Sequence, residues 1–308
     1  MRSAITRSRL LGSLVLAAIL LAGCGNGPAS VGAAAFVGDS RIPVNEVQGR
    51  FRTVLDKEPA AKQQLDQQGQ LGEFGRRLAT DLVRRRLVEQ ATRDEGLRVD
   101  ERQLTELINA AGGPEKASAG QIYTPADFRD AMRSRLLTGE LGRKYIDRLG
   151  VTYDVTSATN RREAEDKARR MSRGEQESAA VVAADRQAGV GAATGEHLRS
   201  AEVPELAAAT PLFGALPGTT MAFELQPQSG QWTVVRIKQR STEERAAPSG
   251  AGADEAKMQA VGAQLLRVTA QRIGVQLSPR YGVWDEIALS AAPSAGETIG
   301  IAFQPRRA

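Results

Sequence analysis

The sequence predicts an α+β fold in which a mainly helical unit is joined to a small unit of strands and helices. Between residues 44 and 149, apolar residues recur at every third or fourth position, which is the spacing of amphipathic helices. From residue 150 to 240 this pattern is interrupted: residues 151–156 alternate apolar and polar side chains as strands do, and residues 219–225 and 231–239 are also predicted to be strands. Helical spacing returns at residues 255–273, so a second helical segment follows the strands.

Composition excludes several classes of protein. The 308 residues include one cysteine and one histidine, which excludes a disulfide framework, a cysteine-rich metal site and any mechanism that needs two imidazoles. Three arginines within the first nine residues supply much of the net charge of +5, and the rest of the chain is near neutral. A nucleic-acid partner is therefore not expected. No motif implies a metal or a cofactor.

The amino terminus has the features of a secretory signal peptide over residues 1–23. Residues 1–9 are basic, and the apolar run over residues 10–21 is shorter than the roughly 20 residues that a membrane-spanning helix needs. The next residues, Leu21-Ala22-Gly23-Cys24, resemble the bacterial lipobox. That resemblance implies cleavage between Gly23 and Cys24 and attachment of a diacylglyceryl group to the Cys24 thiol.

Residues 24–35 are uncharged and rich in glycine and alanine, so they predict a flexible, lipidated tether. Two or three acyl chains hold a protein stably at a membrane, because each buried methylene contributes about 0.8 kcal/mol. The predicted location is the extracytoplasmic face of the bacterial cell membrane, with the lipid as anchor.

Residues 36–149 are predicted to form the helical domain. Phe51, Leu55, Phe128 and Met132 are candidate contacts for an unfolded client protein, because apolar side chains that include methionine suit adaptable binding. The alternative interpretation is that each belongs to the ordinary core.

Beyond residue 240, the composition predicts a linker over residues 241–254. Residues 255–288 are expected to form a helix and tail that pack on the amino-terminal helices, since an isolated amphipathic helix needs a partner for its apolar face. Residues 289–308 are expected to be a flexible tail.

Three short patterns, taken in order, resemble the SurA-like extracytoplasmic chaperones. They are Val37-Gly38-Asp39 with Ile42-Pro43-Val44, then Leu87-Val88-Glu89-Gln90-Ala91 with Gly96-Leu97-Arg98-Val99-Asp100, and Gly274-Val275-Gln276-Leu277-Ser278-Pro279-Arg280-Tyr281-Gly282-Val283-Trp284-Asp285. The resemblance covers about residues 36–149 and 255–288. It implies a helical SurA-like domain that the carboxy-terminal helix completes, and a role as a chaperone or foldase.

Residues 150–240 resemble, more weakly, a degenerate parvulin-type prolyl isomerase domain. The matching features, in order, are a strand, a helix with Glu163-Ala164, a glycine-rich loop, Pro211-Leu212-Phe213, Gly218 and a last strand. The two histidines of that family fall here on Thr233 and near Tyr153 or Asp154, while His197 is expected in a loop. The active-site residues therefore do not carry over, and no catalytic residue is assigned.

The arginine run Arg84-Arg85-Arg86 is interpreted as a solvated helix face, with contact to anionic lipid headgroups as the alternative. Taken together, these features predict a membrane-anchored, ATP-independent chaperone for unfolded or partly folded exported proteins, without prolyl isomerase catalysis. The alternatives are a divergent peptidyl-prolyl cis-trans isomerase, and an adaptor lipoprotein that binds one folded envelope partner.

Overall fold

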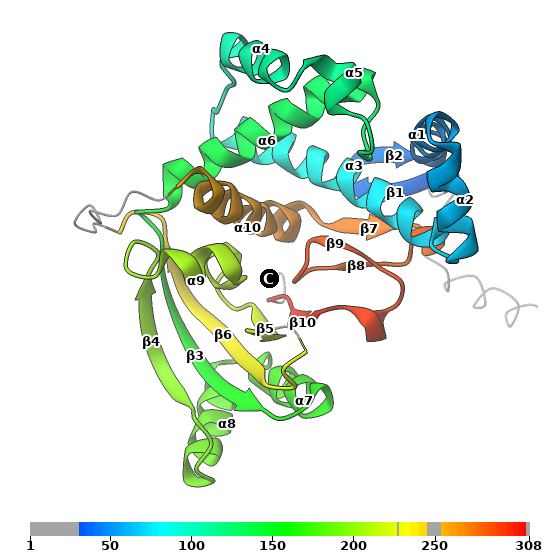
Figure 1. Ribbon diagram of the computed structural model, residues 1–308. Helices are drawn as coiled ribbons and strands as arrows, with labels where there is room; N and C mark the ends of the chain where they lie inside the picture. Colours follow the sequence, from blue (N-terminus) through cyan, green and yellow to red (C-terminus); the bar gives the residue numbers. More distant parts are fainter. Residues whose placement is uncertain (1–30, 227, 245–253, 306–308) are drawn as a thin grey trace, which may run out of the picture.

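A computed structural model describes residues 31–226, 228–244 and 254–305 and confirms the α+β fold class. Figure 1 shows a helical lobe and a sheet lobe, with helix α10 between them. The signal peptide, Gly23 and Cys24 lie outside the described residues. Within those residues, no helix is both long enough and apolar enough to span a bilayer.

The helical lobe is built mainly from the first half of the chain. Its elements are β1 (Ala33–Val37), β2 (Ser40–Pro43), α1 (Val44–Lys57), α2 (Pro59–Gln67), α3 (Leu71–Asp94), α4 (Glu101–Ala110), α5 (Gly113–Ala117) and α6 (Pro125–Tyr145). Helix α3 forms because apolar residues recur along it, and its stripe of Phe74, Leu78 and Leu82 is buried as predicted. Helix α6 begins where expected, with Thr124 accepting a hydrogen bond from the Asp127 N–H and Pro125 in the first turn.

The sheet lobe contains one antiparallel sheet in the order β10-β5-β6-β3-β4, with helices against it. Its elements are β3 (Gly150–Ala158), α7 (Arg161–Met171), α8 (Glu175–Gln187), β4 (Ala193–Arg199), α9 (Pro204–Ala209), η2 (Leu212–Gly214), β5 (Thr220–Glu224) and β6 (Trp232–Ser241). Strand β6 forms where predicted and is covered on both faces, since Trp232 and Val234 pack in one core cluster and Val235 and Ile237 in another.

The last part of the chain returns to both lobes. It consists of α10 (Glu255–Ile273), β7 (Val275–Leu277), η3 (Pro279–Tyr281), β8 (Val283–Asp285), β9 (Ser290–Ala292), η4 (Ala295–Glu297) and β10 (Gly300–Phe303). Strand β7 pairs with β1, so that Ala35 lies opposite Leu277. The β8–β9 hairpin packs on α3, where the Ala291 N–H donates to Thr80 Oγ1 at 2.9 Å.

Helices α6 and α10 cross at glycines. A Cβ added at Gly262 would lie 1.8 Å from the Thr138 carbonyl oxygen, and one added at Gly142 would lie 1.8 Å from the Met258 oxygen. Only hydrogen atoms fit in this crossing. Because α10 also packs on α3, α9 and η2, it contacts elements of both lobes.

Three predictions about the chain's organisation are wrong. Residues 33–35 are not part of a tether, because they form the buried start of β1 between β2 and β7. The segment predicted as a flexible tail, residues 289–308, contains strand β10, which pairs antiparallel with β5 and extends the sheet; residues 306–308 lie outside the described residues. His197 lies in strand β4, opposite Thr152 of β3, rather than in a loop. The other predicted domain boundaries stay predictions.

Candidate functional site

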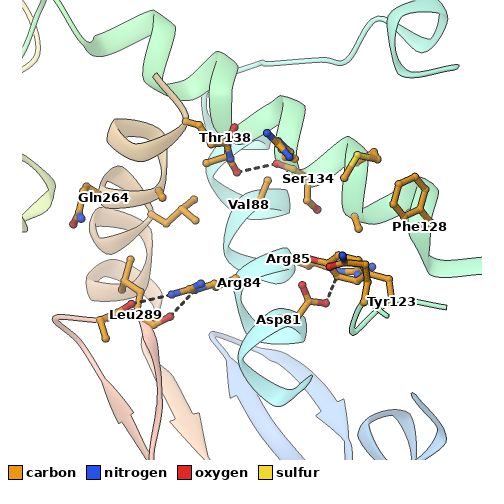
Figure 2. A pocket seen from close by; sticks show the side chains of 18 of the residues that line it. Asp81, Arg84, Arg85, Val88, Tyr123, Phe128, Ser134, Thr138, Gln264 and Leu289 are labelled. Carbon is orange, nitrogen blue, oxygen red and sulfur yellow. Dashed lines mark hydrogen bonds and ion pairs between the residues drawn. The ribbon is translucent and has the colours of Figure 1, made fainter. Parts of the chain in front are cut away.

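A hollow of about 780 Å³ opens in the helical lobe between α3, α6 and α10. The segment around Tyr123, which precedes α6, and the turn at Ile287–Leu289 complete its walls. Figure 2 shows side chains from these elements pointing toward one another across the hollow. We call it the arginine hollow, because Arg84, Arg85, Arg135 and Arg267 all line it.

One wall holds a buried ion pair on α3. Arg85 Nε lies 2.8 Å from Asp81 Oδ2, and Arg50 of α1 reaches the same oxygen at 3.3 Å. The guanidinium of Arg85 also stacks on the Tyr123 ring, 5.2 Å from its centroid. Arg85 is only 7% exposed, and its Nη2 has no hydrogen-bond partner among the described residues. This wall therefore contains a hydrogen-bond donor, Arg85 Nη2, that has no acceptor among the described residues.

Two further arginines bind backbone carbonyls rather than carboxylates. Arg84 donates to the Leu289 and Ala288 oxygens at 2.8 and 3.0 Å. Arg267 of α10 donates to the Glu286 and Ile287 oxygens at 2.9 and 2.6 Å. These bonds fix the turn at residues 286–289, while leaving the positive charges without a directly bonded anion.

Burial changes the protonation equilibria around the hollow. It raises the pKa of Asp81 above its ordinary value, although Arg85 and Arg50 act to lower it. It also raises the pKa of Tyr123, as does the nearby Asp81 charge. Burial lowers the pKa of Arg84, and it lowers the pKa of Arg267 to about 10. Arginine stays charged at neutral pH even so, and the hollow stays cationic.

The structure brings together two of the four predicted client contacts. Phe128 and Met132, one turn apart on α6, both line the arginine hollow, where Met132 is half-buried and Phe128 is only 5% exposed because it packs in the core with residues of α4. Phe51 and Leu55 lie elsewhere, where α1 packs on α3; the Phe51 ring meets Phe74 edge-on at 5.6 Å. Leu55 is 2% exposed. Phe51 and Leu55 thus pack with the core, and a single cradle of all four residues is not formed.

The interpretation of Arg84-Arg85-Arg86 as a solvated face is wrong for Arg85, which is buried beside the hollow. Arg84 is exposed at the rim of the hollow, where it donates to backbone oxygens, and Arg86 pairs with Glu89 at 3.1 Å. The side chains of three consecutive helical residues are spread over about 200° of the helix circumference, so they cannot share one face. The position of Asp81, one turn before Arg85, was the sequence signal for a buried pair.

In the sheet lobe, the positions that correspond to parvulin histidines hold Thr233 and either Tyr153 or Asp154. Asp154 is 1% exposed and accepts hydrogen bonds from Ser178 Oγ at 2.7 Å and the Gly195 N–H at 3.0 Å. Lys238 Nζ lies 3.8 Å from the same carboxylate. His197 Nδ1 lies 3.1 Å from Thr152 Oγ1. These contacts link strands and helices, and they place no pair of imidazoles at a cleft.

Among the described residues, no group of three or more histidine, cysteine, aspartate or glutamate side chains is arranged to hold a metal ion. The arginine hollow therefore offers hydrogen-bond donors, one carboxylate and an apolar patch. This combination suits a ligand that has both charge and apolar surface.

Comparison with known proteins bears out the class of protein. Residues 3–140 match the family model of the SurA-like N-terminal domain, so this part of the chain is SurA-like. The match covers α3 and most of α6 and supports a chaperone or foldase role. The resemblance predicted for the helical domain is thus confirmed.

A solved structure with some similarity is the crystal structure of the foldase protein PrsA from Lactococcus lactis. Its sequence is 12% identical, the alignment covers 80% of this chain and 94% of that chain, and the TM-score is 0.27. At that score the likeness carries no argument. No curated protein sequence is significantly similar to the chain.

Proposed function

We propose that the chain is a lipid-anchored extracytoplasmic chaperone, which binds unfolded segments of exported proteins in the arginine hollow. The observation that carries this proposal is the hollow itself, which combines Phe128 and Met132 with exposed and buried arginines inside a SurA-like domain. Adaptable methionine and flexible charged side chains suit many different segments. Binding needs no ATP, which is absent outside the membrane.

The anchor in this proposal is a lipid on Cys24. It is supported by the basic start, the short apolar run and the Leu21-Ala22-Gly23-Cys24 pattern. The proposal assigns no prolyl isomerase catalysis, because Tyr153 and Thr233 supply no imidazole. The sheet lobe then serves as a second contact surface or as a lever for the helical lobe.

Aggregation of a diluted, chemically unfolded protein tests the proposal. The full chain, kept in solution by a mild detergent, is expected to suppress light scattering near an equimolar ratio, while detergent alone does not. Met132→Ser is expected to weaken suppression because Met132 lines the hollow. Leu107→Ser is the matched control, since Leu107 is 42% exposed on α4 outside the hollow.

The same preparation is added in catalytic amounts to a protein whose refolding is limited by proline isomerisation, a phase of about 10–100 s at 25 °C. No acceleration is expected. Acceleration would favour the divergent isomerase instead. Absence of suppression at tenfold excess would overturn the chaperone proposal and favour an adaptor with one folded partner.

A further inference from the structure

The arginine hollow carries more positive than negative charge. Asp81 is the one carboxylate among the described residues that line it. That carboxylate is shared by Arg85 and Arg50, and Arg50 is also 3.0 Å from Asp127. Asp81 and Asp127 therefore balance Arg50 and Arg85, and no carboxylate of residues 31–226, 228–244 or 254–305 is within ion-pair distance of the remaining arginines that line the hollow.

Two of those arginines are placed to receive an anion. Arg84 uses two of its N–H groups on the Leu289 and Ala288 carbonyls, which hold its guanidinium at the wall without neutralising it. Arg135, one turn after Met132 on α6, is exposed and has no hydrogen bond or ion pair within the described part of the chain. Positive charge on two walls of a concave site favours a negative ligand.

Arg85 provides an independent observation that points to a ligand. Its side chain is buried, it lines the hollow, and its Nη2 lacks a hydrogen-bond partner. A buried charged donor without an acceptor is unfavourable, and an entering carboxylate oxygen would satisfy it. Tyr123, stacked on the same guanidinium, keeps the donor group in a fixed orientation.

The apolar part of the hollow lies beside these donors. Phe128 and Met132 are on the same helix as Arg135, and Tyr123 lies in the segment just before that helix. A ligand that filled the whole hollow would thus carry a carboxylate and an apolar side chain close together. An inorganic anion would use only the charged part.

We propose that the arginine hollow binds polypeptide segments that carry a carboxylate next to an apolar side chain. The carboxylate is bound by Arg84, Arg85 and Arg135, and the apolar side chain packs on the half-buried Met132, beside the edge of Phe128 that faces the hollow. This inference rests on the proposed function and gives its clients a chemical class. An acidic side chain and a free carboxy terminus offer the same carboxylate.

Fluorescence anisotropy with labelled peptides tests the inference on the full chain. Three peptides share an apolar core: one has internal glutamates and an amidated end, one has glutamines instead, and one has glutamines and a free carboxy terminus. We expect the glutamate peptide to bind about tenfold more tightly than the amidated glutamine peptide. Tight binding of the third peptide instead would identify the terminal carboxylate as the bound group.

Arg135→Gln and Arg77→Gln form a matched pair of variants. Both arginines are exposed and without a described polar partner, but only Arg135 lines the hollow. Arg135→Gln is expected to reduce the preference for glutamate about threefold, since an exposed ion pair is weak. Arg77→Gln, on α3 outside the hollow, is expected to leave the preference unchanged.

All three peptides binding with equal affinity, while aggregation is still suppressed, would overturn the inference and leave the proposed function standing. If only the peptide with the free carboxy terminus binds more tightly, the terminal carboxylate is the bound group. An equal loss of preference in both variants would also overturn the inference, because it would indicate a general surface charge effect. Carboxylate preference without aggregation suppression would support the site and overturn the general chaperone role. If the chain neither prefers carboxylate peptides nor suppresses aggregation, both the carboxylate site and the chaperone role are overturned.

Discussion

The two lobes bury charged groups in different ways. In the sheet lobe, Asp154 is surrounded by donors from Ser178, Gly195 and Lys238, so the buried carboxylate is satisfied within the fold. In the helical lobe, Arg85 is almost as deeply buried, yet one of its nitrogens is unpaired at the wall of a hollow. A closed polar cluster stabilises a fold, whereas an open one keeps hydrogen-bonding capacity for a ligand.

The largest change in stability is expected at α10, the helix that packs on elements of both lobes. Gly262→Ala would place a Cβ against the Thr138 carbonyl oxygen and force α6 and α10 apart. We expect the free energy of unfolding to fall by about 3 kcal/mol, as measured by urea denaturation. Gly49→Ala is the control, because nothing lies within 4 Å of its added Cβ; that variant is expected to gain about 0.5 kcal/mol. An unchanged stability in Gly262→Ala would contradict the close crossing.

An intermediate change in stability is expected in the polar cluster around Asp154 in the sheet lobe. Asp154→Ala removes the acceptor for Ser178 Oγ and the Gly195 N–H, and it leaves the fully buried Ser178 hydroxyl without that partner. We expect a loss of about 2 kcal/mol in stability, with peptide binding at the arginine hollow unchanged. Asp166→Ala, at an exposed position on α7, should change stability by less than about 0.5 kcal/mol. If peptide binding is lost in Asp154→Ala at temperatures where the protein is folded, the two lobes do not act separately.

The smallest effect concerns pH. The Thr159 N–H and Lys167 lower the pKa of Glu163 to about 2. A carboxyl group whose pKa is lower in the folded state stabilises the fold above its unfolded value, near 4.5, and this contribution is lost as pH falls toward 2. Because the side chain is 36% exposed, we expect only about 1 kcal/mol after screening by solvent.

Denaturation at a series of pH values checks this expectation. Glu163→Gln should lose stability less steeply than the parent between pH 4.5 and 2. Glu165→Gln removes the same charge from the same helix at a residue that pairs with Arg169, and it provides the comparison. Identical slopes in the two variants would show that Glu163 makes no special contribution.

The sequence was sufficient for elements whose signals are local. The helical spacing of α3 and the alternation over residues 151–156 depend on residues a few positions apart, and the structure has a helix and strand β3 at these places. It was not sufficient for β10, because four residues of ordinary composition become a strand only through pairing with β5. Residues 33–35 were mistaken for tether for the same reason: β1 is defined by its partners β2 and β7.

The candidate site was predicted only in part. Phe128 and Met132 were identified because apolar side chains one helical turn apart form a face, and the structure places both at the hollow. Arg85 was assigned to solvent, since a helical projection does not reveal which neighbours cover each side. It is covered by Tyr123, which lies almost forty positions later in the sequence, while Arg84 binds the turn at residues 288–289, some two hundred positions later.

The pairing of β1 with β7 has a consequence for the order of folding. Strand β1 cannot complete its hydrogen bonds until the polypeptide beyond α10 is available, because Ala35 pairs with Leu277 of β7. Contacts so far apart in sequence close slowly, since the loss of loop entropy precedes any gain from pairing. A chain that crosses a membrane as an unfolded thread, beginning at its amino terminus, would therefore finish its helical lobe only after nearly all of it had emerged.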